Sequence, residues 1–143
     1  MNKTFKGQAG DGDIVTIRLS TNDGLTGYKI VKLDGISTSP GKVDQETIIQ
    51  AFTVKPASAT DTVNFDNPTL IGVCYFKDFA TNDNAPSDHT IIFDTVVFNQ
   101  DIYLTISDAR STNSANYYLE LEQVKLSKDE ATVATLKDMR GRE

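Results

Sequence analysis

Apolar side chains recur at every second position over most of this chain, and no other feature restricts its fold as strongly. In residues 13–20, Val15, Ile17 and Leu19 share one face of an extended segment, with polar residues between them. Successive side chains of a strand point to opposite faces of a sheet, so this alternation is typical of a strand with one buried face. The pattern predicts a sheet-rich fold.

Similar patterns return along the chain at nearly regular spacing. Residues 70–79 and 89–98 are almost continuously apolar, as expected for strands covered on both faces. Further candidate strands are residues 28–33, 47–54, 102–107 and 116–126, with short edge strands at 4–6 and 62–65. Turn-forming residues, such as Asn-Asp-Gly at 22–24, separate them. About eight strands without long intervening helices predict an all-β, antiparallel sandwich of the jelly-roll type.

The C-terminal segment departs from this pattern and predicts a short α-helix. Ser127 and Glu130 have the spacing of a capping box, in which each side chain bonds to the backbone N–H of the other residue. Val133, Leu136 and Met139, together with alanines, form a narrow apolar stripe. A helix of about 12 residues is marginal alone in water, so we expect it to dock, either on its own sandwich or on a neighbouring subunit.

The length of the chain, 143 residues, suits one domain better than two. We therefore expect residues 1–126 to form the sandwich and residues 127–143 to form a helix of the same domain. The formal net charge of -6 argues against nucleic acid as a partner, because phosphates are bound mainly through Lys and Arg. We also expect no membrane partner and no secretory signal, since no segment has the required apolar length.

Residues with reactive side chains are few. Cys74, the only cysteine, lies in an apolar run that favours a buried side chain over a reactive thiol. His89 is the only histidine, and the adjacent Asp88 would point to the opposite face of a strand. One cysteine and one histidine cannot complete a structural zinc site. The sequence therefore predicts no catalytic, cofactor-binding or metal-binding residue.

Oxygen-rich clusters leave calcium as the least implausible ion. Asp11 and Asp13 form one candidate cluster, and Asp83, Asn84 and Asp88 form another. Aspartate and asparagine are also the usual residues of β-turns, and neither cluster reproduces an EF-hand loop. We therefore expect turns at both places.

Carboxylates and tyrosines keep a carbohydrate- or ligand-binding module as the alternative function. Glu120 and Glu122 share one face of a candidate strand, as a glycosidase pair would, but a solvent-facing strand produces the same spacing. Tyr103, Tyr117 and Tyr118 could form a small platform for a sugar ring, although roles in the core and its rim are favoured. We do not expect an enzyme.

The chain as a whole is poor in cysteine, rich in Thr, Asn and Asp, and ends in the capped helix. In this pattern it resembles small virion proteins of tailed bacteriophages, namely capsid decoration proteins and jelly-roll minor capsid components. The resemblance implies a non-enzymatic structural protein, made in the host cytoplasm and located in the virion. It also implies binding to capsid protein or to its own copies as a homo-oligomer. The resemblance rests on no diagnostic motif and transfers no site residue or cofactor.

Overall fold

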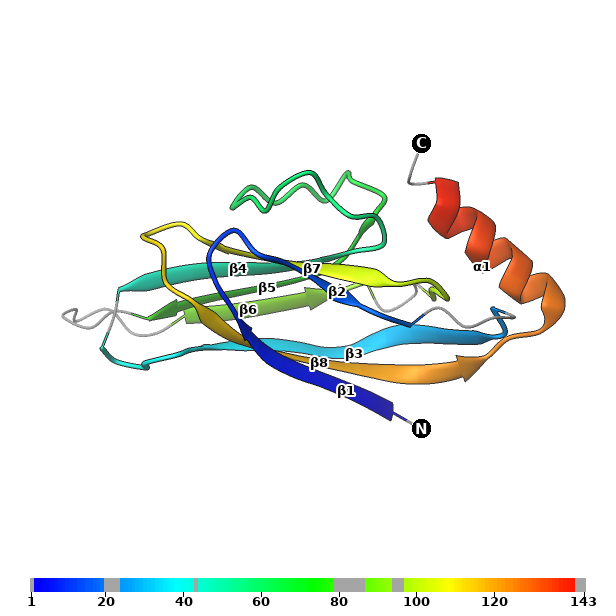
Figure 1. Cartoon of the computed structure of the whole chain (residues 1–143), viewed down its shortest axis with the longest axis horizontal. Helices are drawn as coiled ribbons and strands as arrows, with labels where there is room; N and C mark the ends of the chain where they lie inside the picture. The colour runs from blue at the N-terminus through cyan, green and yellow to red at the C-terminus, as the bar shows by residue number, and fades with distance from the viewer. Residues whose placement is uncertain (1, 20–23, 43, 79–86, 94–96, 141–143) are drawn as a thin grey trace.

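A computed structural model of the chain contains two antiparallel β-sheets and a C-terminal helix (Figure 1). The structure describes residues 2–19, 24–42, 44–78, 87–93 and 97–140. The elements in this part of the chain are β1 (Asn2–Ala9), β2 (Ile14–Ile17), β3 (Thr26–Ser37), β4 (Gln45–Phe52), β5 (Leu70–Asp78), β6 (Ser87–Ile92), β7 (Ile102–Asp108), β8 (Ala115–Lys125) and α1 (Lys128–Arg140).

The two sheets stack as a sandwich. One has three strands in the order β1-β8-β3, and the other has five in the order β2-β7-β4-β5-β6. All the pairings are antiparallel. The predicted fold, an antiparallel β-sandwich with a short C-terminal helix, is therefore confirmed.

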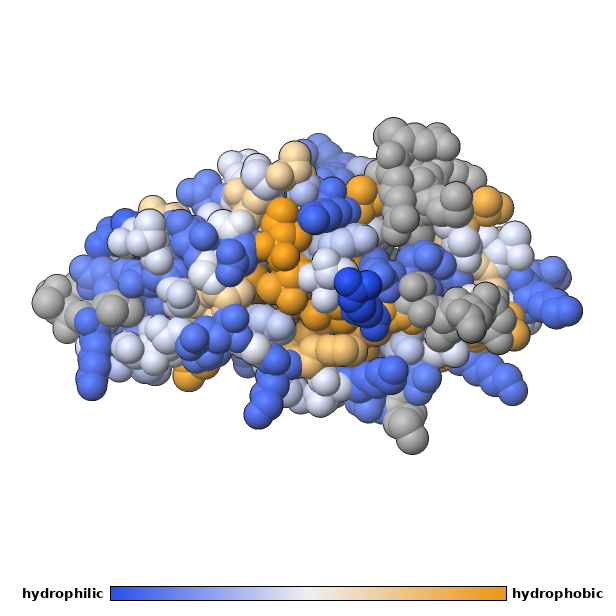
Figure 2. Space-filling view, in the orientation of Figure 1, coloured by the Kyte–Doolittle hydropathy of each residue, from blue (hydrophilic) through white to orange (hydrophobic). Residues whose placement is uncertain are grey.

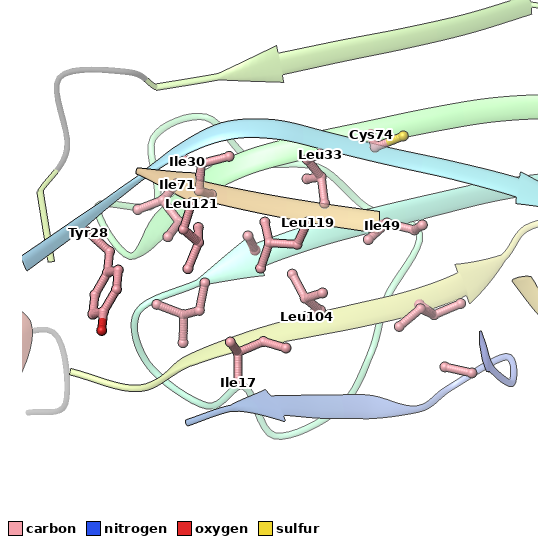
Figure 3. Close-up of a cluster of buried hydrophobic side chains, with 14 of the residues drawn as sticks. Ile17, Tyr28, Ile30, Leu33, Ile49, Ile71, Cys74, Leu104, Leu119 and Leu121 are labelled. Carbon is pink, nitrogen blue, oxygen red and sulfur yellow. The ribbon is translucent and has the colours of Figure 1, made fainter. Parts of the chain in front are cut away.

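The core lies between the sheets and is built from the alternating residues of the strands (Figure 3). Ile49, Leu104, Leu119 and Leu121 have no exposed surface at all. Cys74 is buried in the same core, as its apolar surroundings predicted. Burial of this inner face is what the period of two in the sequence encodes.

The connection between β4 and β5 folds back over the outer side of the five-stranded sheet (Figure 1). Gln50, which is 1% exposed, donates its Nε2 to the carbonyls of Thr60 and Thr62, both at 3.1 Å. Phe65 meets Phe93 edge to face, with ring centroids 5.5 Å apart. A second apolar cluster therefore lies beneath this loop, formed by Ile48, Phe52, Leu70 and Val73 with Tyr75 and Phe93 beside them.

One strand prediction is wrong, and another is right only in part, with residues 94–96 outside the described part of the chain. Residues 62–65 belong to this loop and form no strand; Asn64 Oδ1, for example, accepts the N–H of Asp66 at 3.0 Å in a local turn. Residues 89–98 were expected to be a strand covered on both faces. Instead β6 ends at Ile92 and is the edge strand of its sheet, so that His89 and Ile91 are exposed.

Helix α1 docks on its own sandwich. Its Ala131 and Ala134 pack with Leu126 into a small cluster that also includes Leu25, Val97 and Val124. Asn99, which has no exposed surface, donates its Nδ2 to the carbonyl of Gly24 at 3.0 Å, to the carbonyl of Ala131 at 3.3 Å and to Thr135 Oγ1 at 2.7 Å.

Of the apolar stripe predicted on the helix, the alanines dock and the larger side chains that the structure describes do not. Val133 is 65% exposed and Leu136 is 53% exposed, while the side chain of Met139 lies outside the described residues. The small side chains of Ala131 and Ala134 face the sandwich instead, which lets the helix backbone come within reach of the Asn99 amide.

The capping box at the start of α1 is confirmed. Ser127 Oγ accepts the N–H of Glu130, and Glu130 Oε1 accepts the N–H of Ser127, both at 3.2 Å. Both hydrogen bonds with Ser127 lower the pKa of Glu130 below its ordinary value. The bond from the Ser127 backbone has the larger effect. The ionised Glu130 therefore stabilises the folded state at pH values above the ordinary glutamate pKa. This stabilisation is lost as the pH falls through the lowered pKa of Glu130.

Two phenylalanines on opposite faces of the five-stranded sheet test this assignment of the core. Phe76 is 6% exposed and packs between the sheets, whereas Phe93 is half-buried under the loop. We expect Phe76→Ala to lower the free energy of unfolding by about 3–5 kcal/mol and Phe93→Ala by about 1–2 kcal/mol. Urea unfolding measures both, and equal losses would contradict the assignment.

The anchoring of α1 can be tested at Asn99. Asn99→Ala leaves the buried carbonyls of Gly24 and Ala131 without this donor, so we expect a loss of about 1–3 kcal/mol in unfolding free energy. Hydrogen exchange should show faster exchange in α1 than in β8. Gln100→Ala is the control, because Gln100 makes only a long 3.5 Å bond to Asn99. Unchanged exchange in α1 after Asn99→Ala would disprove the anchor.

Candidate functional site

An open groove of about 710 Å³ lies where β3, β5 and β8 come together. Its lining combines aromatic, amide, carboxylate and ammonium side chains. The lining residues are Lys32, Asp34, Gly35, Ile36, Ser37, Pro40, Phe76, Lys77, Asp78, Asn116, Tyr117 and Tyr118. Pockets with an apolar floor and a few convergent polar groups are the usual form of a ligand site, so this groove is the candidate site.

The floor of the groove depends on two glycines that flank Tyr117 on neighbouring strands. Tyr117 on β8 pairs with Gly7 on β1 and with Gly35 on β3. A Cβ at Gly7 would lie 2.6 Å from the Tyr117 hydroxyl oxygen, and a Cβ at Gly35 would lie 2.9 Å from the Phe76 ring and 2.8 Å from Ile49. Only glycine leaves room for these side chains, a common reason for a glycine inside a strand.

Tyr117 and Tyr118 reach the groove from opposite faces of β8. Tyr117 packs against the core between the sheets, while Tyr118, the next residue, points to the outer face. Tyr103 lies on β7 in the other sheet and does not line the groove. Tyr103, Tyr117 and Tyr118 therefore do not form one platform, because alternation separates the two neighbours and the fold separates the third. Tyr117 packs against the core, a role that was favoured over the platform.

Two neighbouring side chains, Glu120 and Lys32, interact with Tyr118. Its hydroxyl donates to Glu120 Oε1 at 3.1 Å, and the ammonium of Lys32 lies 5.8 Å from the centre of its ring. Glu120 Oε2 in turn accepts Asn2 Nδ2 at 3.1 Å. The hydrogen bond to Glu120 is the main reason that the pKa of Tyr118 is raised above its ordinary value, with desolvation and the charge of Glu120 acting in the same direction.

The carboxylates at the rim of the groove accept hydrogen bonds from backbone N–H groups. Asp34 Oδ1 accepts the N–H of Gly35 at 2.9 Å, and Asp78 Oδ2 accepts the N–H of Gly41 at 2.9 Å. Together with Lys32 and Lys77 they give the rim both signs of charge. The lysines and aspartates of the rim are therefore balanced in charge.

Glu120 and Glu122 share the outer face of β8, as their spacing predicted, but they have different partners. Glu122 Oε2 forms an ion pair with Lys29 Nζ at 3.2 Å, and both side chains are well exposed. Glu120 is bonded to Tyr118 and Asn2. The arrangement matches the solvent-facing strand that was favoured over a glycosidase pair.

The first candidate calcium cluster forms a turn in the structure. Asp11 Oδ1 accepts the N–H of Asp108 at 2.8 Å, and Asp13 Oδ2 accepts the N–H of Gly10 at 2.7 Å. Gly12 between them has a positive φ of 88°, as such a turn needs. Among the residues that the structure describes, no three His, Cys, Asp or Glu side chains gather as metal ligands would.

The second candidate calcium cluster cannot be assembled from the described residues. Asp83, Asn84 and the side chain of Asp88 lie outside them. His89, beside Asp88, is exposed on the edge strand β6 and pairs with Tyr75 on β5.

Sequence reasoning missed most of the residues at this site. Lys32 and Asp34 lie on β3, Phe76 and Asp78 lie on β5, and none of them belongs to a motif. The one available signal was Gly35, because a glycine inside a strand often marks a close approach by another group.

Comparison with known proteins adds no family: neither a protein-family model nor a curated protein sequence matches this chain. Within the part of the chain that the structure describes, no helix combines the length and the apolar character needed to cross a membrane.

The bond between Tyr118 and Glu120 can be tested by titration. We expect Glu120→Gln to lower the pKa of Tyr118 toward the ordinary tyrosine value, because a charged acceptor favours the protonated phenol. Ultraviolet titration of the tyrosines, assigned with Tyr118→Phe, measures the change. Glu122→Gln is the control on the same face, and an equal shift there would show that net charge, not this bond, raises the pKa.

Proposed function

We propose that the protein is a non-enzymatic structural subunit that associates with other protein subunits through the open edges of its sheets. One observation carries the proposal: within the described residues, the outermost strands of each sheet have no further strand on their outer side, apart from a single bridge between Tyr28 on β3 and Phe98. β1 and β3 are the edges of one sheet, and β2 and β6 are the edges of the other. Unpaired N–H and C=O groups along such an edge can accept a strand from another subunit.

The polar side chains of the described residues support this proposal by the roles that they have. Asp108, which is buried, accepts the N–H groups of Glu46, Arg110 and Asn113 and the side-chain amide of Asn113, at 3.0–3.1 Å. Asp11 and Asp13 also accept backbone N–H groups. These carboxylates hold loops in place, which is what a rigid building block requires.

The partner that we propose is capsid protein or further copies of this chain, and the proposed location is the virion. This part rests on the resemblance of the whole chain to small virion proteins. Because α1 docks on its own sandwich through Asn99, assembly would depend on the strand edges and not on exchange of the helix. The net charge of -6 gives the surface little attraction for nucleic acid inside such a particle.

The groove supports a second candidate, a carbohydrate-binding module. Tyr118 offers a ring face, Asn116 offers an amide, and Asp34 and Asp78 offer carboxylate oxygens within one groove of about 710 Å³. Sugar recognition uses ring stacking together with several hydrogen bonds to hydroxyl groups. Strand edges have no role in this function.

Two measurements separate the candidates. For the structural subunit, sedimentation velocity of the purified chain should show a defined oligomer whose fraction rises with concentration, and electron microscopy should show particles of one size. For the carbohydrate module, a glycan array should give binding that Tyr118→Ala removes. A monomer at every concentration that binds a glycan would contradict the structural subunit and support the module.

A further inference from the structure

The geometry points to β1 as a self-pairing strand: two copies of the chain join edge to edge through antiparallel β1 strands, with Phe5 at the two-fold axis. The two three-stranded sheets then become one continuous sheet. This inference rests on the proposed structural function and names its partner, a second copy, and its surface, the outer edge of Asn2–Ala9.

The free edge of β1 is long and regular. β1 pairs with β8 from Asn2 to Ala9 without a shift in register, and it contains no proline. Within the described residues, its backbone makes hydrogen bonds to β8 alone. In an antiparallel pair, alternate residues direct their N–H and C=O groups away from the partner strand. Figure 1 shows β1 at the front of the molecule with no other element over it.

The other edges are shorter or obstructed. On β3, the Leu33 carbonyl accepts the Thr90 hydroxyl at 3.3 Å, and the Gly35 N–H is bonded by the Asp34 carboxylate at 2.9 Å. The β3 register also shifts between Ile30 and Lys32. β2 has only four residues and β6 only six, against eight in β1. Self-pairing therefore favours β1.

The charges on β1 do not block its edge. Lysine on an edge strand commonly prevents pairing with other chains. The ammonium of Lys3, however, lies 5.7 Å from the centre of the Tyr28 ring on β3, so this side chain runs across β8 over the inner face of the sheet. Lys6 projects from the opposite face, where its own register partner is Tyr118. The charge of Lys3 is therefore directed away from an incoming strand.

Register selects Phe5 as the centre of the pairing. In a continuous sheet, paired residues must share a face, so a slip by one residue would put inward side chains on the outer face. With Phe5 on the axis, Lys3 lies opposite Gly7 of the second copy, and Thr4 lies opposite Lys6 of the second copy. Centring on Lys6 would place two lysines directly opposite each other, which is destabilising.

Pairing about Phe5 also covers apolar surface. Phe5 on β1 and Val15 on β2 are only partly buried, although both pack against the core. Figure 2 shows hydrophobic surface in the region between β1 and β2. A second Phe5 brought to the axis would face the first across the new pairing, and aromatic cross-strand pairs stabilise sheets.

The test places a charge at Thr4 in the full-length chain. Across the two-fold axis, the new lysine of each copy would lie opposite Lys6 of the other copy, which gives two repulsive pairs. Within its own chain the new lysine would lie opposite Glu120, so the fold should be retained. Sedimentation equilibrium should show self-association weakened by about tenfold. Gln8→Lys is the matched control, because it adds the same charge to the same face but lies opposite the uncharged Asn2 of the second copy, and we expect a change below about twofold. Circular dichroism checks that each variant is folded.

A charge reversal completes the test. Thr4→Lys combined with Lys6→Glu should restore self-association, since each lysine then faces a glutamate of the other copy. An oligomer that responds equally to Thr4→Lys and Gln8→Lys would overturn pairing through β1 while leaving the structural function in place. A chain that stays monomeric at every concentration would overturn self-pairing and leave capsid protein as the proposed partner, whereas a monomer that binds a glycan would overturn the structural function as well.

Discussion

The burial of two facing rows of branched apolar side chains is the interaction on which the rest of this structure depends. Leu119 and Leu121 from the three-stranded sheet and Ile49 and Leu104 from the five-stranded sheet lose all contact with water. Each row exists because apolar residues occupy every second position of a strand. The groove, the docked helix and the open edges all lie around this core, and none of them would keep its geometry without it.

The same periodicity explains which parts of the fold the sequence could predict. Alternation identified most strands and the capping box identified the helix start, because both signals are local. The long apolar run after His89 was misread, since a local pattern does not show whether a strand lies at the centre or the edge of a sheet. The docking face of α1 could be predicted only in part for a related reason. Asn99, which bonds to the carbonyl of Ala131, is far away in the sequence, and the helix pattern alone does not show that the alanines dock while Val133 and Leu136 stay exposed.

The candidate site was less predictable than the fold. Its lining comes from three strands that are distant in the sequence, and no residue type in it is diagnostic. The tyrosines had drawn attention because exposed aromatics often bind ligands. Tyr117 and Tyr118 line the groove, whereas Tyr103 lies on a strand of the other sheet. This difference depends on the order of the strands in the sheets, which composition does not show. Side-chain oxygens that suggested calcium instead bind backbone N–H groups, the commonest role of aspartate in turns.

The amide of Asn99 has a mechanical consequence. This one side chain joins the backbone at Gly24, the backbone at Ala131 and the hydroxyl of Thr135, so it connects the segment before β3 with the helix that follows β8. β8 is the central strand of its sheet and is bonded along both sides. Tension applied to the C-terminal end therefore acts first on the small apolar cluster around Ala131 and Ala134 and on the Asn99 amide, and only then on the sheet. The helix would detach at low force, and the sandwich behind it would remain closed.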